Sequence, residues 1–209
     1  MVAIFCAEFF INIFITGTDT DVGKTVVSAW ICMHTRADYW KPIQTGNDSD
    51  KDIITKLSPH TKIIAEVYKL RAPLSPYDAA NMENIAIDVN AFSKNLGNTV
   101  IEGAGGVLVP ITENFLMADL VKMCDAKALV VAKSKLGMIN HLLMTVEVLR
   151  ARGIDILGII INGSIEDNLK CTIEEFSKLK ILSIIPQDDD VDKALRITAL
   201  PPEILEIMK

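Results

Sequence analysis

The chain has 209 residues, of which 50 % are hydrophobic and 23 % are charged. This length and composition suit one compact α/β domain and argue against long disordered stretches. The formal net charge of −6 excludes a broad basic surface, so we expect no nucleic-acid partner. Four widely separated cysteines without a CxxC pair predict free thiols in a reduced cytoplasm, and neither disulfides nor a zinc site.

The N-terminal stretch is strongly apolar, which suggests a signal peptide or a membrane anchor. No lysine or arginine precedes Lys24, however, and Glu8 and Asn12 interrupt a run shorter than the ~20 residues that a membrane span needs. We therefore expect no membrane association and assign residues 10–16 to a buried first strand. Residues 1–9 are interpreted as a possible N-terminal extension of a single domain covering residues 1–209.

Short apolar runs alternate with helical patterns along the chain, which predicts an α/β fold with a mostly parallel central sheet. Continuous apolar runs at 129–131 and 159–161 indicate strands covered by helices on both faces. The expected strands are residues 11–15, 99–101, 128–132, 156–161 and 181–185. The expected helices are residues 23–35, the stretch after Asp50, and residues 115–124, 139–152 and 165–178.

A glycine-rich segment, Gly17-Thr-Asp-Thr-Asp-Val-Gly23-Lys24-Thr25, lies between the first strand and the first helix. In such loops, backbone N–H groups and a helix N-terminus converge on phosphate oxygens. Lys24 is expected to reach the terminal phosphates of ATP, and Thr25 to place its hydroxyl on Mg²⁺. The two glycines lie one residue further apart than usual, so Thr18 stands at the first glycine position. A tight turn without a ligand is the disfavoured alternative.

Glu102 follows a predicted strand and precedes a predicted loop, Gly103-Ala-Gly-Gly106. Glycines let the backbone approach a ligand closely, and ligands of parallel sheets bind beyond the carboxyl ends of the strands. A carboxylate in this place can hold Mg²⁺. The alternative is a strand-end residue that faces solvent.

A second lysine lies in the turn Trp40-Lys-Pro-Ile-Gln-Thr-Gly46. By itself Lys41 is more readily interpreted as a solvated surface residue, because lysines are mostly exposed. Three aspartates follow the turn and precede an apolar helical pattern, where they either begin the helix or supply one metal ligand. They are Asp48, Asp50 and Asp52.

Four segments together resemble the dethiobiotin synthetase family in their order and spacing. They are Gly17 to Thr25, Lys41-Pro-Ile-Gln-Thr-Gly46, Glu102-Gly-Ala-Gly-Gly106 and Lys135-Leu-Gly-Met-Ile-Asn-His141, and the similarity spans about residues 14–186. The resemblance implies a P-loop NTPase fold and an ATP-dependent ligase of biotin biosynthesis. In that reaction 7,8-diaminononanoate and CO₂ form a carbamate, ATP phosphorylates it, and the second amine displaces phosphate to give dethiobiotin and ADP.

The resemblance implies that Lys24 and Lys41 are catalytic, because they neutralise charge on the phosphates and the carbamate without acting as nucleophiles. Thr45 is expected to contact the diamine. A homodimer is also implied, in which a loop at a helix N-terminus receives the substrate carboxylate from the neighbouring subunit. This substrate-binding loop comprises Gly137, Met138, Ile139 and Asn140.

The resemblance further implies that Thr25, Asp50 and Glu102 surround Mg²⁺, with Asp52 as the alternative aspartate. Asn162 is expected in the adenine pocket, although an Asn-Gly turn without a ligand is the other interpretation of its sequence. The remaining nucleotide contacts are expected from Asp21, Val22, Gly23, Lys24, Val26, Gly103, Ala104, Gly105 and Pro186.

Two other classes of protein share part of this pattern. Partitioning and regulatory ATPases have the same strand, P-loop and parallel sheet, but they usually carry a further lysine early in the loop, where Thr18 and Asp19 stand here. They also lack the Lys-Pro-Ile-Gln-Thr-Gly segment. A noncatalytic ATP-binding module is disfavoured, because both lysines and the expected metal ligands are present.

Overall fold

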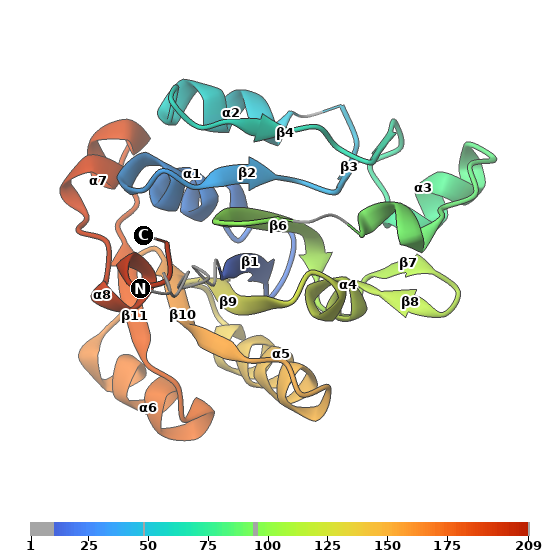
Figure 1. Cartoon of the computed structure of the whole chain (residues 1–209). Coiled ribbons are helices and arrows are strands. Elements are labelled where there is room, and N and C mark those ends of the chain that lie inside the picture. The colour runs from blue at the N-terminus through green and yellow to red at the C-terminus, as the bar shows by residue number, and fades with distance from the viewer. Residues whose placement is uncertain (1–10, 48, 94–95, 209) are drawn as a thin grey trace, which may run out of the picture.

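The computed structural model describes residues 11–47, 49–93 and 96–208. Its centre is a parallel sheet of seven strands in the order β11-β10-β9-β1-β6-β2-β4, with helices on both sides (Figure 1). The α/β fold with a parallel central sheet is thereby confirmed. Residues 1–9, interpreted above as a possible extension, and Asp48 lie outside the described residues.

The central strands are β1 (Asn12–Gly17), β2 (Asp38–Trp40), β4 (Ile63–Ile64), β6 (Thr99–Gly106), β9 (Ala126–Lys133), β10 (Ile156–Asn162) and β11 (Ile181–Ile185). Two small sheets pair β3 (Ile43–Thr45) with β5 (Tyr68–Leu70), and β7 (Pro110–Thr112) with β8 (Phe115–Leu116). The helices are α1 (Lys24–His34), α2 (Asp50–Leu57), α3 (Pro76–Met82), the short 3₁₀ helix η1 (Val89–Phe92), α4 (Met117–Met123), α5 (Met138–Ala151), α6 (Asp167–Ser177), α7 (Val191–Ile197) and α8 (Pro202–Leu205).

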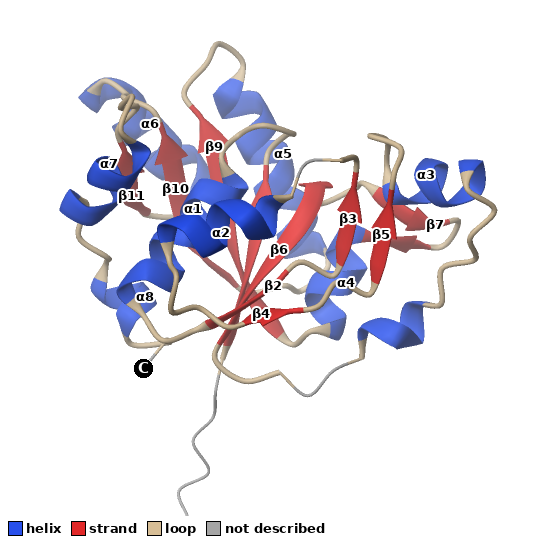
Figure 2. Cartoon of the chain, turned by 90° about the horizontal axis from the view of Figure 1, so that it is seen from above, coloured by secondary structure: helices blue, strands red, loops and turns tan. Residues whose placement is uncertain are grey.

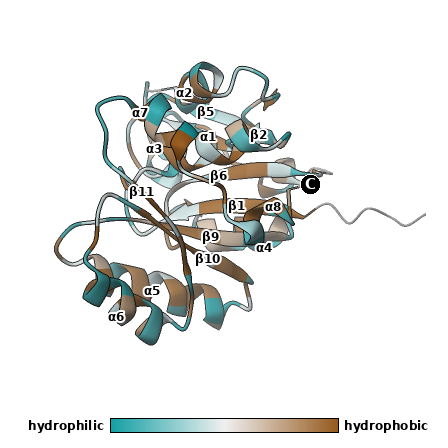
Figure 3. Ribbon diagram, turned by 90° about the vertical axis from the view of Figure 1, so that its left-hand side faces the viewer, coloured by the Kyte–Doolittle hydropathy of each residue, from teal (hydrophilic) through white to brown (hydrophobic). Residues whose placement is uncertain are grey.

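The sheet is covered on both faces, because its strands send apolar side chains to alternating sides. Ile13 and Ile15 of β1 pack in one cluster with α1, α2, α7 and α8, whereas Phe14 packs in another with α4. A third cluster joins β10 to α5 and α6. Figure 2 shows α1 and α2 in front of the sheet and α5 and α6 behind it, and the strands between them are largely apolar (Figure 3).

Two segments have a different secondary structure from the one expected. The stretch Gly103–Gly106 is not a loop, because β6 continues through it and Gly106 pairs with Gly17 of β1. The missing side chain at Gly103 makes this close pairing possible, since a Cβ there would lie 2.7 Å from the ring of Phe14. The helix expected from Phe115 begins instead at Met117, because Phe115–Leu116 pair as β8 with β7.

In the part of the chain that the structure describes, no helix combines the length and the apolar character that crossing a membrane requires.

Replacing Gly103 by alanine is expected to lower the free energy of unfolding by about 1–3 kcal/mol, because the added methyl group overpacks against the buried ring of Phe14. Gly106→Ala is the matched control in the same strand. Its added Cβ makes only a 3.4 Å contact with the Gly17 carbonyl oxygen, so a change below about 1 kcal/mol is expected. Urea unfolding measures the free energy of unfolding of both variants. An equal decrease in the two variants would contradict the prediction.

Candidate active site

The phosphate loop runs from Gly17, at the end of β1, to Lys24, the first residue of α1. Its backbone is left-handed at Asp21, with φ 55°, and at Gly23, with φ 99°. The loop also closes tightly on itself, since a Cβ at Gly17 would lie 2.7 Å from the carbonyl oxygen of Asp19. These turns bring the N-terminus of α1 to the carboxyl end of β1, which is the geometry that binds phosphate.

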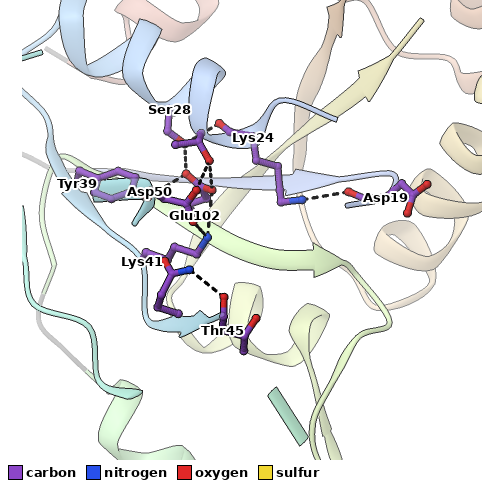
Figure 4. A network of polar contacts seen from close by, with 10 residues as sticks. Asp19, Lys24, Ser28, Tyr39, Lys41, Thr45, Asp50 and Glu102 are labelled. Atoms are coloured by element: carbon purple, nitrogen blue, oxygen red, sulfur yellow. Dashed lines mark hydrogen bonds and ion pairs between the residues drawn. The ribbon is translucent and has the colours of Figure 1, made fainter. Parts of the chain in front are cut away.

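Lys24 lies inside this loop and is 8 % exposed. Its Nζ donates a hydrogen bond of 3.0 Å to the Asp19 carbonyl oxygen (Figure 4). Burial lowers the pKa of Lys24, an effect that the negative charge of Glu102 opposes in part. A phosphate anion beside this ammonium would favour its charged form.

Glu102 of β6 is the centre of a polar cluster at the carboxyl end of the sheet (Figure 4). The Thr25 hydroxyl lies 2.8 Å from Oε1 of Glu102 and 2.8 Å from Oδ1 of Asp50. Lys41, directly after β2, forms ion pairs with Asp50 and, at 3.5 Å, with Glu102. Three chain segments that are distant in sequence therefore meet in one site.

The Lys41 ammonium is held in its charged form. Burial by itself would lower the pKa of Lys41, but attraction to Glu102 and Asp50 outweighs burial and raises it. Lys41 is consequently a cation at neutral pH, suited to neutralising an anion and unsuited to acting as a free amine.

The oxygen atoms of this cluster fit a divalent cation. Thr25 has one hydroxyl proton, so it can donate to Asp50 or to Glu102 but not to both. A hydroxyl and two carboxylates form an oxygen donor set of the kind that Mg²⁺ prefers. Among the described residues there is no group of three or more His, Cys, Asp or Glu that could hold a metal, so water and phosphate oxygens would complete the coordination.

Asp52, the alternative to Asp50, is exposed in the first turn of α2. Asp50 is directed towards Thr25 and Lys41 instead. The helical backbone explains the difference, because side chains two positions apart on a helix point in different directions around its axis. The structure thus brings Asp50, and not Asp52, into contact with Thr25.

Asn162, at the end of β10, packs against the phosphate loop. Its Nδ2 donates to the Val22 carbonyl oxygen at 3.1 Å, and a Cβ at Gly23 would lie 2.2 Å from that nitrogen. Asn162 pairs in register with Ile185, so Pro186 follows at the next strand end, where it is exposed. Both residues lie at the edge of the sheet on which a nucleotide bound to the loop would lie.

The segment 137–140 begins α5, with Gly137 in the left-handed region at φ 90°. Lys135 beside it forms a 3.0 Å ion pair with Asp19 of the phosphate loop. Within the described part of the chain, no hydrogen bond joins segment 137–140 to the cluster around Glu102. Thr45 lies instead at the end of β3, where its carbonyl oxygen accepts a 3.0 Å hydrogen bond from Nε2 of Gln44.

Comparison with known proteins identifies the family. The chain matches the AAA domain family over residues 11–194. It is 45 % identical to the ATP-dependent dethiobiotin synthetase BioD of Paramagnetospirillum magneticum, covering 91 % of this chain and 95 % of that protein. It is 42 % identical to the protein of the same name from Lawsonia intracellularis, covering 93 % and 97 %. The chain belongs to the ATP-dependent dethiobiotin synthetase family.

Solved structures show the same fold at low sequence identity. A putative plasmid partition protein from Borrelia burgdorferi bound to AMPPNP has a TM-score of 0.57 and 13 % identity, covering 94 % of this chain and 97 % of that one. The MinD cell division protein of Aquifex aeolicus has a TM-score of 0.53 and 16 % identity, covering 88 % and 85 %. At such identities the likeness concerns the P-loop NTPase fold alone. It carries no conclusion about a function shared with this synthetase family member.

Two residues of this dethiobiotin synthetase family member were missed by sequence reasoning. Ser28 and Tyr39 both donate to Oε2 of Glu102, at 3.0 and 2.9 Å. Ser28 had a detectable signal, because it lies three residues after Thr25 and so on the same face of α1. Tyr39 resembled an ordinary core aromatic of a strand, and its partner is 63 residues away in sequence.

Nucleotide binding is expected to take up protons at alkaline pH. The pKa of Lys24 is lowered by burial in the free protein, and a phosphate anion would raise it again, so ADP binding should add protons as the pH approaches the free-protein value. Calorimetry of ADP binding in buffers of different ionisation enthalpy should show larger proton uptake at pH 9 than at pH 7. Lys24→Met should remove the increase; its persistence in that variant would assign the proton to another group.

Proposed function

We propose that this chain is a dethiobiotin synthetase that closes the ring of 7,8-diaminononanoate with CO₂ at the expense of ATP. The observation that carries the proposal is the convergence of Lys24, Thr25, Lys41, Asp50 and Glu102 on one end of the sheet. The names of the relatives support the same reaction. The enzyme is then a ligase of biotin biosynthesis, for which we propose a cytoplasmic location.

The reaction needs cations more than it needs a protein nucleophile. CO₂ adds to one substrate amine to form a carbamate and release a proton. A carbamate oxygen then takes the terminal phosphoryl group of ATP, which releases ADP. The second amine attacks the carbamoyl carbon and loses a proton, so a C–N bond forms as the C–O bond breaks and inorganic phosphate leaves. Anionic oxygens are present throughout, and fixed positive charge next to them lowers the barrier.

Lys24 and Lys41 are the catalytic residues in this proposal. Lys24 lies in the phosphate loop, where it would contact the transferred phosphoryl group. Lys41 stays charged because its attraction to Glu102 and Asp50 raises its pKa by more than burial lowers it. Its ammonium would neutralise the negative charge of the carbamate. Thr45, at the end of β3 and shortly after Lys41 in the chain, would hold the diamine.

We assign the Mg²⁺ ligands to Thr25, Asp50 and Glu102, because the Thr25 hydroxyl lies 2.8 Å from an oxygen of each of the two carboxylates. When bound, Mg²⁺ would neutralise phosphate charge and orient the terminal phosphoryl group. The protein contributes the positions of the oxygens. For the nucleotide we propose the backbone of residues 21–26 and 103–105 as contacts, with Asn162 and Pro186 beside the adenine.

The substrate carboxylate is proposed to bind residues 137–140 of a second copy of the chain. The N-terminus of α5 carries a partial positive charge that suits an anion. Leu136 is fully exposed in this single chain, which is compatible with a surface that a second subunit covers. A homodimer is therefore part of the proposal.

The first test is release of phosphate from MgATP with and without 7,8-diaminononanoate and bicarbonate, together with mass analysis of the product. We expect release to depend on the diamine and to yield dethiobiotin. Lys41→Ala should lower kcat/KM by a factor on the order of 10²–10³, because a charge aimed at the reacting oxygens is lost. Hydrolysis that is independent of the diamine and leaves no such product would refute the proposal.

Lys62→Ala is the matched control for that experiment. Lys62 is also ion-paired, to Asp38 at 3.0 Å, but its side chain is 75 % exposed. Exposed pairs contribute little, so its kcat/KM should stay within about twofold of wild type.

Asp50→Asn and Asp52→Asn separate the two candidate aspartates. Asp50→Asn should raise the Mg²⁺ concentration needed for half-maximal turnover by at least about tenfold, because a charged ligand is lost from the site. Asp52→Asn should leave it unchanged, since that side chain is exposed in α2. Titration of turnover against Mg²⁺ at saturating ATP measures both; the opposite ranking would move the metal to Asp52.

A further inference from the structure

The carboxylate of Glu102 divides its two oxygens between different partners. Oε1 lies 2.8 Å from the Thr25 hydroxyl and 3.5 Å from Nζ of Lys41, on the side of the proposed phosphate and metal site. Oε2 accepts hydrogen bonds from Ser28 and Tyr39, at 3.0 and 2.9 Å. Oε1 is therefore directed towards the proposed metal and phosphate site, and Oε2 towards buried residues of α1 and β2 (Figure 4).

The two donors to Oε2 are not equivalent. The Ser28 hydroxyl lies 2.9 Å from the Lys24 carbonyl oxygen as well as 3.0 Å from Glu102, and its single proton can serve one of them at a time. Among the hydrogen bonds of the described residues, the Tyr39 hydroxyl has Glu102 as its one acceptor. Tyr39 is thus the committed donor and Ser28 a shared one.

The placement of Tyr39 is rigid. Tyr39 lies in β2 and pairs in register with Val100 of β6, which precedes Glu102 by two residues. The ring is 1 % exposed and packs in the cluster that joins the sheet to α1. A side chain held in this way can fix the orientation of its acceptor, because neither partner can turn without leaving a buried polar atom unpaired.

We propose that Tyr39 is a positioning residue, which holds Oε2 of Glu102 so that Oε1 is presented to Mg²⁺. The inference rests on the proposed metal-binding role of Glu102 and extends it to a residue that does not touch the ligands. Partners that orient a metal ligand typically change metal affinity by about 10–100-fold when they are removed.

Tyr39→Phe tests this inference, since it removes one oxygen atom and keeps the ring. Binding of Mn²⁺ to the protein–ADP complex, followed by the electron paramagnetic resonance of free Mn²⁺, should weaken about tenfold. ADP binding in EDTA should stay within about twofold of wild type. In turnover, kcat at saturating Mg²⁺ should recover to near the wild-type value, because the ligand itself is intact.

Tyr68→Phe is the matched control. The Tyr68 hydroxyl also makes a hydrogen bond, accepting from the Asp88 backbone N–H at 2.8 Å, but it belongs to β5, outside the cluster. This variant should bind Mn²⁺ as wild type does. Ser28→Ala gives a second variant with an intact Tyr39, and it should weaken Mn²⁺ binding less than Tyr39→Phe does, because Ser28 is shared with Lys24.

Glu102→Gln separates this inference from the function on which it rests. Loss of Mn²⁺ affinity in Glu102→Gln with wild-type affinity in Tyr39→Phe would overturn the positioning role and leave the metal site in place. Wild-type affinity in Glu102→Gln would overturn the metal site and the inference together. A lowered melting temperature of Tyr39→Phe without a change in Mn²⁺ affinity would also overturn the inference, because the hydroxyl would then be structural only.

Discussion

A buried carboxylate organises the candidate active site. Glu102 is 1 % exposed, and burying an ion costs several kcal/mol unless nearby charges and donors compensate. Hydroxyl groups of Thr25, Ser28 and Tyr39 and the ammonium of Lys41 surround it. The hydrogen bonds that stabilise the charge of Glu102 thus connect α1 and β2 to β6. The proposed metal site lies on the Oε1 side of this network.

The order of the strands explains why these residues meet. In the sheet, β6 lies between β1 and β2. Glu102 in the middle of β6 pairs with Ile15 of β1, and the preceding Ile101 pairs with Trp40 of β2. The phosphate loop after β1 and Lys41 after β2 therefore lie on either side of Glu102. Parallel pairing directs all three carboxyl ends to the same edge. Gly103, Gly105 and Gly106 allow β6 to run beside β1 as far as Gly17, and the contact between the strand and the phosphate loop is a pair of glycines, Gly106 and Gly17.

Different surroundings shift the pKa values of the two lysines in opposite directions before any ligand binds. Lys41 contacts two carboxylates and its pKa is raised, whereas Lys24 contacts a backbone carbonyl and its pKa is lowered mainly by burial. A nucleotide phosphate would give Lys24 an anionic partner, as the carboxylates of Asp50 and Glu102 already do for Lys41. The asymmetry agrees with the proposed division of labour, in which Lys24 meets the phosphates and Lys41 the second anion.

The sequence by itself determined the parallel α/β fold and the phosphate loop, because apolar periodicity and glycine spacing are local signals. Most candidate residues of the site came instead from the resemblance of four segments to the dethiobiotin synthetase family, and their roles stay proposals. The sequence missed the extension of β6 through Gly106 and the two donors to Glu102. It preferred Asp50 and kept Asp52 as the alternative, and it did not show that Asp50 contacts Thr25 and Lys41 whereas Asp52 is exposed. Only the tertiary structure decided these points, because strand pairing and hydrogen bonds between residues more than 60 positions apart leave no periodic trace in the chain.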